Sequence, residues 1–204
     1  MIRLSPVVSG GSRIAIVAIV VLGFALATPV SAQNTNLPDG DYETEGGTTI
    51  AWSDAWETSL AMTGVEEEQG FGAFEMLAFE PADDNACATI YCGLSIVVYD
   101  ARNADAQDVE EAYVTTKLAA KGTNVLLDGD ANDTWWALLQ TGTGDSAQTI
   151  MSYTTRIDDE VFAITLTADA GAIVDYLDSA QGSISVDGDE LFAAVDVGDV
   201  EDAL

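Results

Sequence analysis

The stretch GLSIVVYDARNADAQDVEEAYVTTKLAAKG, residues 93–122, decides the fold class, because it joins a strand to a helix through one short turn. Residues 93–100 have an unbroken apolar centre, which predicts a strand buried on both faces of a sheet. Apolar residues then recur at helical spacing over 109–120. Asp105 is placed to cap this helix and Gly122 to follow its last turn. The chain therefore combines at least one helix with a sheet.

Short strand-like runs lie on both sides of this unit, and a second helix closes the pattern. The predicted strands before the helix are residues 48–52, 57–63, 71–80 and 93–100, and those after it are 123–127, 134–140, 148–157 and 161–167. The second helix is predicted over about residues 169–181. Strands grouped around one helix predict an α+β fold, with a mostly antiparallel sheet flanked by two main helices.

Residues 1–32 have the pattern of a signal peptide. They contain no acid, and Arg3 and Arg13 precede the apolar run over residues 14–27. Small residues up to Ala32 predict cleavage there. An uncleaved anchor needs about 20 apolar residues, and this run is shorter. We expect a protein that is secreted or held on the cell-envelope exterior, with membrane contact only through the signal segment if it stays uncleaved.

The rest of the chain divides into three parts. Residues 33–47 are polar and rich in turn formers, which predicts a flexible acidic lead-in. Residues 48–192 are long enough for a single α+β domain with its own core. Residues 193–204 are predicted to form an acidic C-terminal tail that frays.

The charge balance excludes several classes of function. Six basic and 35 acidic residues give a formal net charge of −29, and there is no histidine. A polyanionic surface repels phosphates, which excludes nucleic-acid binding through a basic patch. Without imidazole, Ser-His-Asp and Cys-His catalysis and histidine-ligated metal centres cannot be built. The dispersed acids indicate a solvated coat, and a high-salt habitat, cation binding and cell-wall association all remain open as its explanation.

Cys87 and Cys92 are the two cysteines of the chain. In an exported protein such a pair predicts a structural disulfide rather than a redox site, which would normally have the CxxC spacing. A bridge needs Cα atoms about 5.5 Å apart, so the loop between the two residues must turn back on itself.

Two acidic segments resemble cation sites without meeting their requirements. Residues 128–133 (DGDAND) begin like a calcium loop, but Asp133 replaces the required glycine and Leu139 the bidentate glutamate. Residues 187–190 (DGDE) form a second such segment. Acidic turns are the better interpretation of both. We predict no metal site, no cofactor and no catalytic residue.

Four tryptophans form two close pairs. Trp52 and Trp56 flank a turn, and Trp135 and Trp136 point to opposite faces of one predicted strand. One ring of each pair is expected in the core. The other ring is available as a platform for a sugar or a partner, although covering a helix is the commoner role.

The segment DYETEGGTTIAWSDAW, residues 41–56, resembles the opening of PsbP-like domains of secreted bacterial proteins. The residues that carry the resemblance are Tyr42, Gly47, Ile50, Trp52 and Trp56. The order of predicted elements over residues 42–192 is similar as well. The resemblance implies an α/β/α sandwich and a non-enzymatic interaction or assembly module, and it implies no catalytic residue.

Two functions from different classes follow from these patterns. The first is an exported, non-catalytic binding or structural domain whose acidic surface meets a protein, an envelope polymer or cations. The second is a carboxylate-based extracellular hydrolase, of the glycosidase type, which needs two acids roughly 5–10 Å apart. With 35 acids in the chain, the sequence does not single out such a pair.

Reduction of the Cys87–Cys92 bridge is expected to lower the free energy of unfolding by about 2 kcal/mol without abolishing the fold, because the closed ring is short. Thermal melts with and without reductant measure the change. Mass spectrometry that finds two free thiols in the exported protein would contradict the pairing itself.

Overall fold

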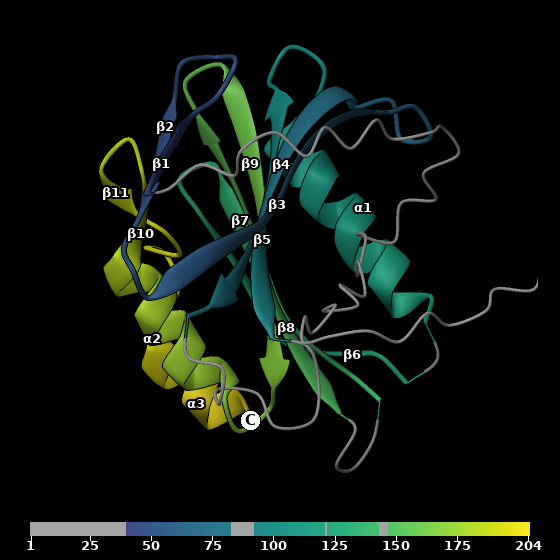
Figure 1. The fold of residues 1–204 in the computed structure, drawn as a ribbon. Helices are drawn as coiled ribbons and strands as arrows, with labels where there is room; N and C mark the ends of the chain where they lie inside the picture. The colour runs from purple at the N-terminus through teal and green to yellow at the C-terminus, as the bar shows by residue number, and fades with distance from the viewer. Residues whose placement is uncertain (1–39, 83–91, 121, 143–146) are drawn as a thin grey trace, which may run out of the picture.

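The computed structural model describes residues 40–82, 92–120, 122–142 and 147–204, which form two sheets and three helices (Figure 1). The strands are β1 Asp41–Glu43, β2 Thr49–Trp52, β3 Trp56–Glu66, β4 Gly72–Pro81, β5 Gly93–Asp100, β6 Asn124–Ala131, β7 Thr134–Thr141, β8 Gln148–Ile157, β9 Glu160–Asp169, β10 Ile184–Val186 and β11 Asp189–Glu190. The helices are α1 Ala106–Leu118, α2 Ile173–Ser183 and α3 Val197–Ala203.

The larger sheet has seven strands in the order β3-β4-β5-β9-β8-β7-β6, and every neighbouring pair is antiparallel. Strand β9 is central and is buried along nine of its ten residues. Its neighbour β5 is also buried along most of its length, which confirms the prediction from the apolar run over residues 93–100. The edges of this sheet are β3 and β6, and β6 is largely exposed.

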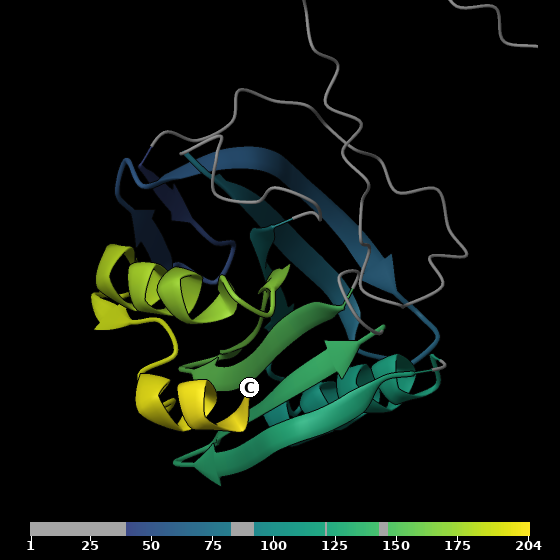
Figure 2. The same ribbon diagram turned by 90° about the horizontal axis from the view of Figure 1, so that it is seen from below.

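The helices cover opposite faces of the large sheet (Figure 2). Helix α1 packs over β7, β8 and β9, with Val109 and Tyr113 in the core beneath it. Asp105 caps this helix, as predicted, by accepting a hydrogen bond from the amide of Gln107 at 3.0 Å. Helices α2 and α3 lie on the other face, where Ile173 and Val200 are fully buried in the larger core.

A second, smaller sheet has the order β1-β2-β10-β11. Its two halves come from distant parts of the chain, because β2 pairs with β10 in a register that sets Ile50 opposite Val186. Both side chains belong to the same core as α2 and α3. The small sheet therefore joins the beginning of the described chain to the segment that follows α2.

The prediction of one mostly antiparallel sheet flanked by two main helices was wrong. The described residues are mostly β-sheet, with 11 strands in two sheets and three short helices. The seven strands of the large sheet, strand β2 and the helices α1 and α2 were predicted close to their observed positions. The second sheet was missed because β10 and β11 have only three and two residues, too few for a periodic pattern.

Two segments outside the predicted domain core are built into the fold. Residues 41–43 of the expected lead-in form β1, which pairs with β2. Residues 193–204, expected as a fraying tail, contain α3, where the side chain of Asp196 caps the amide of Gly198 at 2.8 Å. Burial of Val200 explains why this acidic segment is ordered.

The predicted signal segment, residues 1–32, lies outside the described residues. In the part of the chain that the structure describes, no helix has the length and apolar character needed to cross a membrane.

Gly64 of β3 lies opposite Phe74 of β4, and the Phe74 ring covers it. A Cβ at position 64 would lie 2.6 Å from Cζ of Phe74. Gly64→Ala is therefore expected to lower the free energy of unfolding by about 1–3 kcal/mol, because the buried ring must move. Urea denaturation measures the change.

Gly182→Ala is the matched control. No atom lies within 4 Å of a Cβ added at Gly182, which is in α2. The same substitution there is expected to leave stability unchanged or raise it by up to about 1 kcal/mol. Equal losses at both positions would contradict the role of the Phe74 ring.

Candidate functional site

Four glutamates are buried among the described acids, and the remaining described acids are exposed or half-buried. The four are Glu66, Glu75, Glu110 and Glu160. The ion pair found within the described residues joins Asp100 to Arg102, so no described cation neutralises a buried glutamate. A buried carboxylate without a cation must be stabilised by hydrogen bonds, and the donors show what each glutamate does.

Glu66 holds the turn that follows β3. Its carboxylate accepts hydrogen bonds from the amide of Gln69 at 2.9 Å and from the amide of Phe71 at 3.3 Å. The Phe71 ring then packs edge-on against Tyr99 at 5.6 Å between centroids. Burial, and secondarily the charge of Glu66, raises the pKa of the Tyr99 hydroxyl. Glu66 therefore has a structural role.

Glu75 and Glu160 anchor the β1–β2 hairpin on the large sheet. The hydroxyl of Tyr42 and the amide of Glu45 donate to the two carboxylate oxygens of Glu75, the amide at 2.8 Å. The hydroxyl of Thr44 donates to Glu160 at 2.8 Å. Burial, and then the bond to Glu75, raises the pKa of the Tyr42 hydroxyl.

The hairpin can approach Glu160 because residue 46 is glycine. A Cβ at Gly46 would lie 2.3 Å from the carboxyl carbon of Glu160. This contact leaves no room for a larger residue unless Glu160 moves, and Glu160 is held by Thr44. The tip of the hairpin therefore has a defined position over the sheet.

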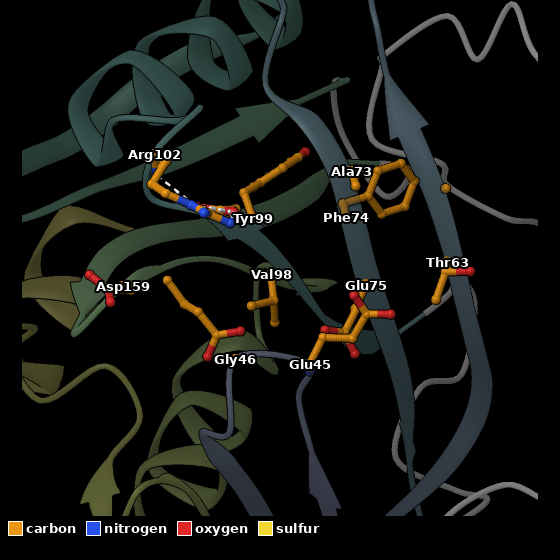
Figure 3. A pocket seen from close by; sticks show the side chains of 13 residues that line it. Glu45, Gly46, Thr63, Ala73, Phe74, Glu75, Val98, Tyr99, Arg102 and Asp159 are labelled. Atoms are coloured by element: carbon orange, nitrogen blue, oxygen red, sulfur yellow. Dashed lines mark hydrogen bonds and ion pairs between the residues drawn. The ribbon is translucent and has the colours of Figure 1, made fainter.

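A cavity of about 580 Å³, the hairpin cavity, lies between this tip and the sheet (Figure 3). Figure 3 shows Glu45 and Glu75 together on one side of it and Asp159 on the opposite side. The charged residues that line it are Glu45, Glu75, Asp100, Arg102, Asp159 and Glu160.

Arg102 does not neutralise the hairpin cavity. Its guanidinium hydrogen-bonds both carboxylate oxygens of Asp100, and this contact lowers the pKa of Asp100 to about 2. The charges of Asp100 and Arg102 therefore compensate each other, and the Arg102 side chain is 84% exposed. The other four acids of the cavity form no ion pair with a described cation, although the charge of Asp159 also contributes to raising the pKa of Arg102. The cavity therefore favours a positively charged ligand.

A second space of about 540 Å³, the α1 groove, lies between α1 and the edge of the large sheet. Val114 and Glu110 of α1 line one side, Trp135 of β7 the floor, and Asp128 and Asp130 of β6 the outer side. Asp130 is the cross-strand partner of Trp135, which places both on the face that α1 covers.

Glu110 lies at the inner side of the α1 groove and is 5% exposed. One oxygen, Oε2, accepts hydrogen bonds from Ser152 at 2.8 Å and Thr154 at 2.6 Å, both on β8. The other, Oε1, is buried and has no hydrogen-bond partner among the described residues. Burial dominates over these two bonds and raises the pKa of Glu110 to about 7.

The two acidic segments noted in the sequence each contain a turn, as predicted, but their other residues lie in strands. Residues 128–133 form the end of β6 and the β6–β7 turn, where Asn132 and Asp133 have φ of 49° and 58°. Residues 187–190 form the β10–β11 hairpin, in which Asp187 accepts a hydrogen bond from the amide of Thr49 at 2.8 Å. Within the described ranges, no set of three or more acids or cysteines is arranged to hold a metal ion.

The tryptophan pairs are placed differently from each other. Trp52 and Trp56 are both buried in the core, so the expectation of one outward ring was wrong for this pair. Trp135 and Trp136 lie on opposite faces, as predicted, but both are half-buried, so the expectation of one core ring was wrong for this pair. Cys92 is buried at the start of β5, and Cys87 lies outside the described residues, so the disulfide stays a prediction.

Sequence reasoning did not single out Glu110. The signal was its position on the apolar side of the helix, four residues after Ala106 and three before Tyr113, both of which are buried.

Glu110→Gln tests the cost of burying this carboxyl. A carboxyl group with an ordinary pKa of 4.5 and a folded-state pKa of about 7 destabilises the fold increasingly as pH rises between these values. Above pH 7 the cost amounts to about 3 kcal/mol. The variant should match the wild type near pH 4.5 and be more stable at pH 8, as measured by urea denaturation. The exposed neighbour variant Glu111→Gln should show no such gain, and an equal gain would contradict the assignment.

Comparison with known proteins finds weak structural similarity to two solved structures. No family model matches the chain, and no curated protein matches its sequence. The crystal structure of the Saccharomyces cerevisiae Ran-binding protein Mog1p is similar at 12% identity and a TM-score of 0.38, covering 65% of this chain and 78% of that one. The solution structure of PsbP from Synechocystis sp. PCC 6803 is similar at 12% identity and a TM-score of 0.42, covering 76% of this chain and 98% of that one. The resemblance to PsbP expected from the sequence is therefore found, as a weak structural likeness from which no ligand or activity is transferred.

Proposed function

We propose that this protein is an exported, non-catalytic binding domain that binds a positively charged partner at the hairpin cavity. The observation that carries the proposal is the charge of that cavity, where Asp100 and Arg102 pair with each other and four further acids form no ion pair with a described cation. Export rests on the sequence pattern of residues 1–32.

The charge of the rest of the surface also favours a positively charged partner. The described cations are Arg102, Lys117 and Arg156, against a large excess of outward-facing acids. Such a field attracts a basic partner over long range and raises its association rate at low salt. The cavity then supplies a defined place for the cationic group, because the hairpin that forms one side is fixed by Glu75 and Glu160.

The hydrogen bonds of the cavity favour binding over hydrolysis. Both oxygens of Glu75 accept bonds from the hairpin, and Glu160 accepts one from Thr44. These carboxylates are thus engaged in holding the structure.

Glu110, in the α1 groove, has the raised pKa that a general acid needs, but its carboxyl accepts its hydrogen bonds from β8 in the interior. Proton transfer requires contact within about 3 Å of the substrate, and an inward-facing, 5% exposed carboxyl does not offer it.

Calorimetric titration with a heptalysine peptide tests the proposal, with heptaglutamate as the negative control. The wild type should bind heptalysine in a salt-dependent manner. The double variant Glu45→Gln/Asp159→Asn removes two exposed acids on opposite sides of the cavity and should weaken binding at least about fivefold, the ordinary lower range for coupled charges.

The matched control is Asp199→Asn/Asp202→Asn, which removes the same charge from α3. It should change the affinity less than twofold. Equal weakening by the two double variants would show that net charge alone drives the interaction and would overturn the assignment to the cavity. Release of soluble fragments from an extracellular polysaccharide by the wild-type protein would instead favour the hydrolase alternative.

A further inference from the structure

The α1 groove is separate from the hairpin cavity, and its residues indicate a ligand of defined chemistry. We propose that this groove binds an alkylammonium group and that binding draws a proton from Glu110 into solvent. The neutral carboxyl and the ammonium ion give a carboxylate beside the same ammonium ion, plus one released proton. The ammonium group belongs either to a free amine or to a lysine side chain of a partner.

The groove combines apolar and acidic surfaces as an alkylammonium requires. Val114 and the 38% exposed Val125 offer contacts for an aliphatic chain, and the half-buried Trp135 offers an aromatic ring to the charged head. Tryptophan is the side chain with the strongest cation–π attraction. Asp128 and Asp130 stand on the outer side, exposed and without a described ion pair.

The burial of Glu110 is a second, independent observation that points to a ligand in this groove. Glu110 is 5% exposed, and its Oε1 is buried without a hydrogen-bond partner among the described residues. A buried, half-satisfied carboxyl is costly in either protonation state. A cation in the groove stabilises the ionised form through space, because the interior screens charge much less than water does. This interaction does not need the contact that proton transfer to a substrate would need.

No described cation already fills this role. Lys117, on the same helix, holds its Nζ over the Tyr113 ring at 5.2 Å from the centroid. Arg156 of β8 donates from Nε to the backbone carbonyl of Asp158 at 3.0 Å. Helix α1 packs against β7, β8 and β9, and β6 lines the groove. Besides Glu110, the titratable and charged groups of these elements are Asp108, Glu111, Tyr113, Lys117, Asp128, Asp130, Tyr153, Arg156, Glu160 and Asp169.

The same geometry disfavours a metal ion. Calcium takes six to eight oxygen ligands at 2.3–2.6 Å. Over the described ranges, no three acids are close enough to hold any metal, and the floor of the groove is Trp135 rather than an oxygen donor. The apolar floor instead matches the methylene chain of an amine.

Isothermal titration at pH 7 and constant ionic strength tests the proposal with n-pentylamine, Nα-acetyl-lysine N-methylamide and, as the neutral control, n-pentanol. Two buffers of different ionisation enthalpy report the protons released. We expect saturable binding at one site by at least one of the two ammonium compounds, release of up to about half a proton, and affinity that rises from pH 6 to pH 8. The stronger of the two compounds identifies the source of the ammonium group.

Three variants separate the parts of the site. Glu110→Gln should abolish the proton release and weaken binding about tenfold at pH 8, a typical coupling between charged groups. Asp128→Asn/Asp130→Asn should weaken binding but keep the proton release. Asp178→Asn, on α2 at the opposite face, should change neither.

Several results would overturn the proposal. One is pentanol binding as tightly as pentylamine, and another is uptake of both amines that does not saturate. Unchanged proton release in Glu110→Gln would show that another group titrates. Calcium binding that displaces the amine and releases the same proton would assign the groove to a metal ion.

Discussion

Buried carboxylates without cation partners are the constraint on which this structure depends. The chain has 35 acids against six basic residues, so a glutamate inside the fold has few cations to pair with. Hydroxyl and amide donors take their place at all four buried glutamates. The turn after β3 and the β1–β2 hairpin are positioned by these bonds, through Glu66, Glu75 and Glu160. Each carboxylate thus fixes a backbone segment that an apolar residue would leave unspecified.

Glu110 departs from this rule and is therefore informative. Its Oε2 has two donors and its Oε1 has none among the described residues, although it is as deeply buried as the other three. The unfavourable free energy of a buried oxygen without a donor thus occurs at the buried glutamate that lines the α1 groove, beside two exposed acids and a tryptophan. An incomplete hydrogen-bond set beside an open space is what a binding site needs and what a structural anchor avoids.

Periodicity and capping residues were enough to locate α1, α2 and most strands of the large sheet, because each of these elements spans several turns or alternations. They could not reveal the small sheet, whose β2–β10 pairing joins residues more than a hundred positions apart. Part of the hairpin anchor was visible in the sequence, since Glu75 stands on the same strand face as Leu77 and Phe79. The groups that donate to Glu75 could not be predicted, because nothing in the sequence of β4 indicates that Tyr42 and Glu45 contact it.

The two acidic spaces differ in how the surrounding solution acts on them. Glu45 and Asp159 of the hairpin cavity are exposed, so salt at physiological strength screens their attraction beyond about 8 Å. Glu110 is shielded from the same ions by α1 and the sheet. Attraction at the hairpin cavity consequently depends on ionic strength, whereas attraction at the inner end of the α1 groove depends mainly on pH. Under the proposed function and the further inference, the two sites would respond differently to their cationic ligands, because one set of acids is exposed and the other is buried.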